Sequence, residues 1–165
     1  MILKTVAARE ALLARSRTVA MVGASANPER PSYDVFRYLR SRGRFDVTPI
    51  NPTITEIDGV RAFPTLTAYA AALGKPDIVD VFRRPDEVLS IVEEAIAIGA
   101  RAIWFQNGVV NEAAIALADA ANLDVVVDRC LKVESASFDG GLSIGTSSRV
   151  LTPERIAELR KARKR

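Results

Sequence analysis

TVAMVGASANPER, at residues 18–30, is the stretch of the sequence that decides the fold. Its first half is apolar and β-branched and ends at Gly23, as expected of a buried parallel strand. Small and polar residues follow, and Pro31 then suits the first turn of a helix. A strand that passes through a short glycine-containing loop into a helix is typical of the opening unit of a doubly wound α/β sheet.

Four further runs of the same kind lie at residues 45–50, 77–82, 102–105 and 124–127. Helical periodicity is found at residues 5–15, 32–43, 65–73, 85–96, 111–122 and 153–163. This alternation predicts a single α/β domain with a Rossmann-like, doubly wound parallel sheet of about five strands. Right-handed crossovers favour the strand order 3-2-1-4-5, numbered along the chain. Residues 51–64 are predicted to be a long irregular connection.

The charge of the chain is divided between an acidic body and a basic tail. The 165 residues carry a net charge of +3, and residues 149–165 hold seven basic and two acidic side chains, so residues 1–148 carry −2. We therefore predict a Rossmann-like domain at residues 1–148 and a basic C-terminal helix or tail at residues 149–165, capped by Thr152. The tail is interpreted as a solvated helix rather than a nucleic-acid surface, because the sequence has neither a zinc pattern nor an aromatic stacking motif.

Several chemistries are excluded by the residue types that the sequence lacks. Histidine is absent, which excludes a Ser-His-Asp or Cys-His nucleophile and any histidine-ligated metal. Asp128 and Glu134 have no carboxylate or histidine partner that the sequence places beside them, so we expect no catalytic residue and no metal. The single cysteine cannot form an internal disulfide, and no signal peptide or membrane span is visible. We therefore expect a cytoplasmic protein without membrane contact.

The loop after the first predicted strand is the first candidate for a binding site, because ligands of doubly wound sheets lie outside the carboxyl ends of the strands. It combines Ser25, Asn27 and Arg30 with the start of a helix, where free N–H groups and the helix dipole favour an anion. We interpret this loop as a phosphate site. The alternative is an ordinary connection between a strand and a helix.

Two further segments follow strand ends. After the third strand, Phe82 suits contact with an adenine and Arg83 suits contact with a phosphate; the alternative is a core phenylalanine and a solvated arginine. After the fourth strand, Gln106, Asn107 and Gly108 suit polar recognition, and they would equally suit a plain turn.

The loop after the first strand does not carry the dinucleotide fingerprint. The pattern Gly-x-Gly-x-x-Gly would need glycines where Ser25 and Pro28 stand, and the chain has no Gly-Lys-Ser/Thr of a P-loop. The second strand ends without the acidic residue with which NAD-binding proteins hold the ribose, although Glu56 and Asp58 follow in the loop. These departures weaken the interpretation as an NAD-binding protein.

A distinctive set of stretches runs through every predicted strand: AMVGASANPERPSYDVFRYL at residues 20–39, VTPINP at 47–52, DIVDVFRRPDEV at 77–88, GARAIWFQNGVVNEAA at 99–114 and VVVDRCLKVE at 125–134. In these stretches the sequence resembles the bacterial and archaeal CoA-binding-domain proteins, which are stand-alone relatives of the N-terminal domain of the succinyl-CoA synthetase alpha subunit. The resemblance implies a Rossmann-like domain that binds coenzyme A.

The resemblance also implies, position by position, which residues bind the ligand. The phosphates of coenzyme A would lie along the first loop, the adenosine beside the end of the second strand, the adenine and ribose against the end of the third, and the pantetheine arm near the end of the fourth. The candidate residues are Gly23, Ala24, Ser25, Ala26, Asn27, Arg30, Asn51, Pro52, Val81, Phe82, Arg83, Gln106, Asn107 and Gly108. Relatives often carry a lysine after the Asn-Pro pair that suits the ribose phosphate, whereas this chain has Thr53.

We expect a module that binds coenzyme A or an acyl-CoA without catalysis of its own. The alternatives are an NAD(P)-binding oxidoreductase, an acyl-CoA-processing subunit, and a protein that contacts its partner through the basic tail. Self-association and an unknown protein partner both stay open. Cys130 is interpreted as a small buried residue after the last strand, and a mixed disulfide with coenzyme A or a redox switch is the alternative.

Overall fold

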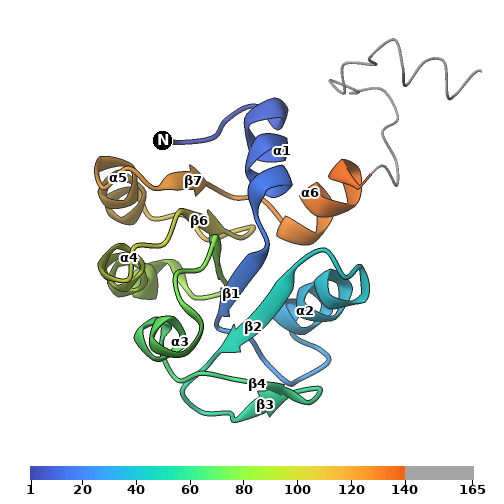
Figure 1. The fold of residues 1–165 in the computed structure, drawn as a ribbon. Helices are drawn as coiled ribbons and strands as arrows, with labels where there is room; N and C mark the ends of the chain where they lie inside the picture. Colours follow the sequence, from blue (N-terminus) through green and yellow to red (C-terminus); the bar gives the residue numbers. More distant parts are fainter. Residues whose placement is uncertain (140–165) are drawn as a thin grey trace, which may run out of the picture.

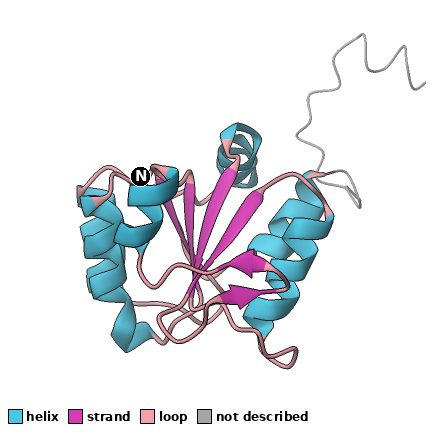
Figure 2. Cartoon of the chain, turned by 60° about the horizontal axis from the view of Figure 1, so that its bottom comes forward, coloured by secondary structure: helices cyan, strands magenta, loops and turns pink. Residues whose placement is uncertain are grey.

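The computed structural model describes residues 1–139, which form a five-stranded parallel sheet with helices on both faces (Figures 1 and 2). The strands of this sheet are β1 (Thr18–Val22), β2 (Asp46–Ile50), β5 (Ile78–Val81), β6 (Ala102–Phe105) and β7 (Asp124–Val126). Each of them lies inside one of the five predicted runs. The Rossmann-like α/β fold predicted from the sequence is thereby confirmed.

The helices form two layers. One face is covered by α3 (Leu66–Leu73), α4 (Val88–Ala97), which follows the 3-10 turn η1 (Pro85–Glu87), and α5 (Glu112–Ala120). The other face is covered by α1 (Val6–Arg15), α2 (Pro31–Ser41) and α6 (Leu131–Phe138). Alternate residues of the central strands enter the two clusters: Val79 and Val81 belong to the cluster on the α4 side, whereas Ile78 belongs to the cluster on the other face. Burial on both faces explains why these strands have near-continuous apolar sequences.

The predicted strand order is wrong in one respect. The sheet has the order β2-β1-β5-β6-β7, so the third long strand pairs with the first strand and not with the second. Pro49 supplies a physical reason, because a proline cannot donate to a sheet ladder and is confined to edge strands. Its carbonyl oxygen faces away from β1 and accepts a hydrogen bond from the N–H of Phe63 at 3.0 Å. A central β2 would need an N–H at this position.

Local helix signals are largely confirmed, with one difference. Thr65 caps α3 and Asn111 caps α5 through side-chain oxygens that accept the N–H groups of Ala68 and Ala114. Ser32, the predicted cap of α2, is instead the second residue of that helix, and its hydroxyl oxygen accepts the N–H of Ser25 at 3.1 Å. The predicted helix at 153–163, its cap and the basic tail lie outside the described residues.

Two elements were not predicted. Residues 51–64 contain a small antiparallel hairpin, β3 (Glu56–Ile57) and β4 (Val60–Arg61), around Asp58 and Gly59. Both turn residues have positive φ, 48° and 79°, as a tight hairpin turn requires. The second unpredicted element is α6, which begins immediately after Cys130.

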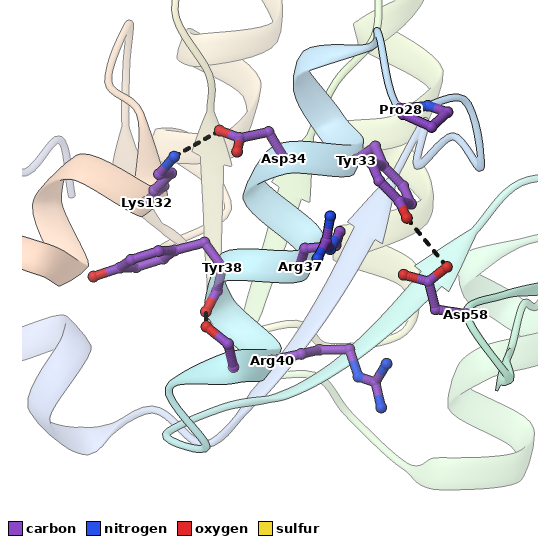
Figure 3. A pocket seen from close by; sticks show the side chains of 9 residues that line it. Pro28, Tyr33, Asp34, Arg37, Tyr38, Arg40, Asp58 and Lys132 are labelled. Carbon is purple, nitrogen blue, oxygen red and sulfur yellow. Dashed lines mark hydrogen bonds and ion pairs between the residues drawn. The ribbon is translucent and has the colours of Figure 1, made fainter.

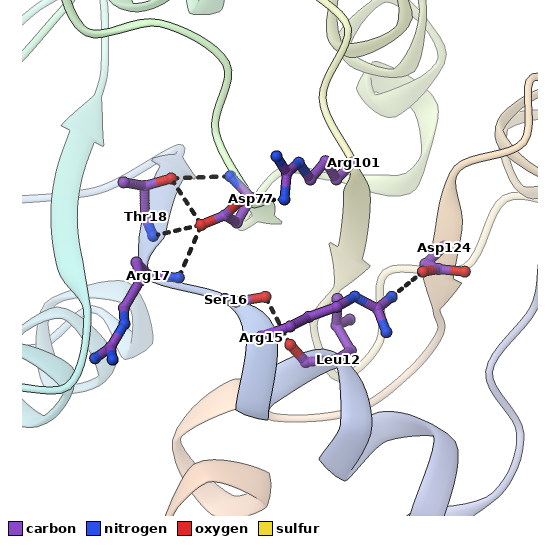
Figure 4. A network of polar contacts seen from close by, with 8 residues as sticks. All are labelled: Leu12, Arg15, Ser16, Arg17, Thr18, Asp77, Arg101 and Asp124. Atoms are coloured by element: carbon purple, nitrogen blue, oxygen red, sulfur yellow. Dashed lines mark hydrogen bonds and ion pairs between the residues drawn. The ribbon is translucent and has the colours of Figure 1, made fainter.

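Asp77 joins the starts of β1 and β5 at the amino end of the sheet (Figure 4). One of its carboxylate oxygens accepts the N–H groups of Arg17 and Thr18 at 2.8 and 3.1 Å, and the Thr18 hydroxyl oxygen accepts the N–H of Asp77 at 2.9 Å. Burial would raise the pKa of Asp77, but these hydrogen bonds and the charge of Arg101 outweigh it, so the pKa is lowered. The network holds the two central strands in register.

Among residues 1–139, no helix has the length and apolar character that a membrane crossing needs.

Candidate functional site

A crevice of about 710 Å³ opens at the carboxyl ends of β1, β5 and β6. It lies where the chain reverses direction across the sheet, because β2 and β5 flank β1 on opposite sides. Such a switch point is where ligands of doubly wound sheets bind. Nine of the fourteen candidate residues line this crevice: Gly23, Ser25, Arg30, Asn51, Phe82, Arg83, Gln106, Asn107 and Gly108.

The other five candidates lie elsewhere. Ala24 and Val81 are completely buried behind the crevice. Pro52 lines an adjoining cavity of about 350 Å³, which shares Gly23, Asn51, Arg83 and Glu87 with the crevice. The remaining two, Ala26 and Asn27, line neither cavity. Thr53 also lies outside both linings, and its hydroxyl donates to the side-chain oxygen of Asn51 at 2.8 Å.

Gly23 allows the first loop to pass close to the segment after β5. Its φ is +80°, and a Cβ atom at this position would lie 2.1 Å from the carbonyl oxygen of Phe82. The N–H of Phe82 donates to the carbonyl oxygen of Val22 at 2.8 Å, so the two strand ends are in direct contact. Only glycine fits here, and it brings the loop after β1 and the loop after β5 to the same crevice.

The loop that follows Gly23 is closed by its own side chains. Ser25 accepts the N–H of Asn27 at 3.1 Å, and Asn27 accepts the N–H of Glu29 at 3.0 Å. This turn leads to α2, whose first residues, Pro31 and Ser32, line the crevice. The positive end of the α2 dipole therefore faces the crevice, which favours an anionic ligand there.

The charged lining of the crevice is mainly cationic. It consists of the guanidinium groups of Arg30, Arg83 and Arg84 and one carboxylate, Glu87. Arg83 and Arg84 both donate to the same Glu87 oxygen, at 3.3 and 3.2 Å. The hydrogen bond from Arg84 lowers the pKa of Glu87, which keeps this group an anion. Two positive charges remain in excess, so the crevice suits a ligand with several negative charges.

An acidic residue that the sequence reasoning missed lies directly under the crevice. Asp80 is fully buried in the middle of β5, and one of its carboxylate oxygens accepts the side-chain amide of Gln106 at 2.7 Å. Burial raises the pKa of Asp80 to about 7, against the opposing effect of that hydrogen bond. The signal in the sequence was an aspartate inside the otherwise apolar run IVDVF at residues 78–82.

Other lining residues were missed, namely Ser32, Val35, Arg84, Pro85, Glu87 and Val109. Cys130 was interpreted as a small buried residue after the last strand, with a mixed disulfide with coenzyme A as the alternative. It is half-buried, precedes the first residue of α6 and lines the crevice.

A second hollow, of about 600 Å³, lies on the outer side of α2 (Figure 3). Lys132 pairs with Asp34 at 2.7 Å, the Tyr33 hydroxyl donates to Asp58 at 3.3 Å, and the Arg37 guanidinium group lies over the Tyr33 ring. The hollow shares no lining residue with the crevice, although Pro28 of the first loop borders it. No group of three or more His, Cys, Asp or Glu side chains that could hold a metal ion occurs within residues 1–139.

The sheet order and the crevice at its switch point define a Rossmann-like α/β protein of the doubly wound class. The sequence model of the CoA-binding-domain family matches residues 17–136, and the chain belongs to this family. The resemblance seen in the sequence is thereby confirmed.

Individual relatives agree with this assignment. The chain is 37% identical over 125 residues to the uncharacterized protein YneT of Bacillus subtilis strain 168, a match that covers 76% of this chain and 90% of YneT. A hypothetical protein from Pyrococcus horikoshii OT3 has a similar structure, with a TM-score of 0.77, 35% identity and coverage of 82% of this chain and 93% of that one. The dinucleotide-forming acetyl-coenzyme A synthetase 1 of Candidatus Korarchaeum cryptofilum matches 66% of this chain with 25% of its own length, at a TM-score of 0.57 and 26% identity.

Proposed function

We propose that the protein binds coenzyme A or an acyl-CoA in the crevice at the carboxyl ends of β1, β5 and β6. The observation that carries the proposal is the convergence of the first loop, the start of α2 and the arginines after β5 on one cavity of about 710 Å³. Membership of the CoA-binding-domain family supports the choice of ligand among anionic cofactors.

The lining suggests how such a ligand would lie. Its diphosphate fits beside Ser25, Arg30 and the N-terminus of α2, within reach of Arg83. The adenosine fits the adjoining cavity beside Pro52, and the pantetheine arm fits the opposite part of the crevice beside Gln106. The thiol end of the arm would then approach the part of the lining that includes Cys130.

We further propose that the protein binds its ligand without transforming it. Two acidic groups near the crevice, Glu87 and Asp80, are poorly placed for proton transfer to a ligand. Glu87 accepts hydrogen bonds from two arginines, and Asp80 is fully buried beneath Gln106. A protein of this kind would hold coenzyme A or its thioester for a partner or sense its concentration.

Calorimetric titration of the full-length protein with coenzyme A, acetyl-CoA, dephospho-CoA, NAD and ATP tests the proposal. Coenzyme A or acetyl-CoA should bind more tightly than NAD and ATP. The variant Arg83→Ala should weaken the binding of coenzyme A about tenfold or more, because a charge-assisted hydrogen bond to a phosphate is lost. Arg37→Ala removes the same charge from the outer side of α2 and serves as the matched control, with unchanged affinity expected.

Three outcomes would contradict the proposal. NAD or ATP could bind more tightly than coenzyme A, none of the ligands could bind, or Arg37→Ala could weaken binding as much as Arg83→Ala does. The last result would show that the ligand responds to overall charge and does not occupy the crevice.

A further inference from the structure

Asp80 and Gln106 form a buried pair that connects the core of the sheet with the crevice. Asp80 is 0% exposed and Gln106 is 4% exposed, yet Gln106 is part of the crevice lining. The Gln106 side-chain nitrogen Nε2 donates to Asp80 Oδ1 at 2.7 Å. The other carboxylate oxygen, Oδ2, is buried and has no hydrogen-bond partner within residues 1–139.

The chemistry of this pair fixes which way the Gln106 amide is turned. At pH 8, where Asp80 is ionised, its carboxylate only accepts hydrogen bonds, so the amide group that faces Asp80 is the NH₂ group. The amide oxygen Oε1 is then turned away from Asp80. Within residues 1–139 no hydrogen bond reaches this oxygen, and it is not among the buried unpartnered atoms. It is therefore the atom of Gln106 that remains available to the crevice.

An aspartate at this position has a cost that a purely structural role does not explain. A buried carboxyl group with one unpartnered oxygen destabilises the folded state, whereas an apolar residue would fit the middle of a central strand well. The neighbours of Asp80 in the sheet are Met21 on β1 and Trp104 on β6, which offer the carboxylate no compensating charge. What Asp80 does supply is a defined orientation of Gln106.

We propose that Asp80 is a positioning residue for ligand selection: it holds Gln106 so that the floor of the crevice presents a hydrogen-bond acceptor to a secondary amide N–H of the ligand. This inference rests on the proposed function, because the pantetheine arm of coenzyme A contains two secondary amides. With Gln106 inverted, the same position would present a donor and would leave an amide N–H of the ligand unpaired, which is costly in a buried site.

The test compares two ligands on four full-length proteins and one control variant at pH 8. The ligands are coenzyme A and 3′-phospho-ADP, which is coenzyme A without its pantetheine arm. The proteins are the unaltered chain, Asp80→Asn, Gln106→Met and the double variant. In Asp80→Asn the new NH₂ group can donate to Gln106 Oε1, and the new carbonyl oxygen then takes the unpartnered position. If Gln106 kept its orientation, the NH₂ group would be buried without a partner, which is more costly than an unpaired oxygen. Asp80→Asn therefore inverts the Gln106 amide.

We expect Asp80→Asn to weaken the binding of coenzyme A about three- to tenfold, the effect of one hydrogen bond, and to leave the affinity for 3′-phospho-ADP unchanged. Gln106→Met should have a similar effect, and the double variant should be no worse than Gln106→Met alone, because Asp80 acts through Gln106. Asp77→Asn, the same substitution immediately before β5 at the amino end of the sheet, is the matched control and should leave both affinities unchanged.

The inference is overturned if Asp80→Asn binds coenzyme A as tightly as the unaltered chain, if both ligands lose affinity equally, or if the effects of the two single substitutions add. If the unaltered chain binds 3′-phospho-ADP as tightly as coenzyme A, the nucleotide part of the proposed function stands and the role of Asp80 is refuted. If it binds neither ligand, the proposed function itself fails.

Discussion

The stability of the protein should depend on pH through one buried side chain, Asp80. Its carboxyl group is fully buried, and its pKa is raised by burial from 3.8 to about 7. Between these two values the unfolded chain releases the proton and the folded chain keeps it. Stability therefore falls as the pH rises from about 4 to 7 and changes no further from this source above pH 7. An acid with a lowered pKa would act in the opposite sense.

The size of the effect follows from the shift. One pKa unit corresponds to 1.36 kcal/mol, so ionisation of Asp80 should remove about 4 kcal/mol from the free energy of unfolding between pH 4 and pH 8. This is a large part of the 5–15 kcal/mol that is typical of a domain. Asp80→Asn has nearly the same shape and no charge, so it lacks this dependence. Its stability relative to the unaltered chain should rise by about 4 kcal/mol over the same pH range.

Urea unfolding of both proteins at half-unit steps from pH 4 to pH 8 measures this difference directly. Subtracting one free energy of unfolding from the other removes the contributions of all other titrating groups, because both proteins share them. A difference that stays constant across the range would refute the reasoning, since it would mean that Asp80 has the same pKa in the folded and unfolded chains. A difference that changes in the opposite direction would show that Asp80 is stabilised as an anion in the fold.

Three further predictions concern other parts of the molecule. Gly23→Ala should lower the free energy of unfolding by about 2–4 kcal/mol in urea titrations, because the Cβ of the alanine would lie 2.1 Å from the Phe82 carbonyl oxygen. The control Gly59→Ala has a similar φ and open space around it, and it should lower the free energy of unfolding by about 1 kcal/mol. Asp77 has a lowered pKa, so its stabilising effect is complete above pH 4 and is lost as the pH falls below 4. The free energies of unfolding of the unaltered chain and of Asp77→Asn should therefore converge below pH 4, and a constant difference between them would contradict this prediction. Thr53→Lys should raise the ratio of the affinities for coenzyme A and dephospho-CoA, measured by calorimetry, about two- to fivefold, because the lysine would form an exposed ion pair with the ribose phosphate. An unchanged ratio would mean that the ribose phosphate lies elsewhere.

The sequence was sufficient to predict the elements that are buried on both faces of the sheet. The five runs of apolar and β-branched residues became the five parallel strands, and the caps at Thr65 and Asn111 marked two helix starts. These signals are local, since they depend on a residue and its near neighbours along the chain. The order of the strands is not a local property, because right-handed crossovers permit more than one order. Pro49 was a clue to the edge position of β2 that the prediction did not use.

The unpredicted elements carry weaker signals. The strands of the β3–β4 hairpin have two residues each, too few for a visible alternation, although Asp58-Gly59 is a favoured hairpin turn. The sequence LKVESASF of α6 has no clear apolar stripe, and only Leu131 and Ser135 are buried. Cys130 follows the last strand as predicted, but it is half-buried at the start of this helix and not fully buried.

The residues of the candidate site were predictable to the extent that they follow strand ends. Phe82, Arg83 and Gln106 come directly after apolar runs, and the carboxyl ends of parallel strands meet at one edge of the sheet. Asp80 lies inside a strand, and its effect on the crevice passes through a hydrogen bond between neighbouring strands. A contact of this kind depends on register, and a single sequence does not contain that information.

The position of β5 next to β1 is what gives the crevice its cationic character. In the order 3-2-1-4-5 the second strand would separate the third from the first, and the loops after them would lie two strand spacings, about 10 Å, apart. In the structure the Phe82 N–H donates to the Val22 carbonyl oxygen at 2.8 Å, and the two loops touch at Gly23. Arg83 and Arg84 therefore line the same cavity as the N-terminus of α2. A diphosphate can meet both only because the chain crosses to the other side of β1 after the edge strand that contains Pro49.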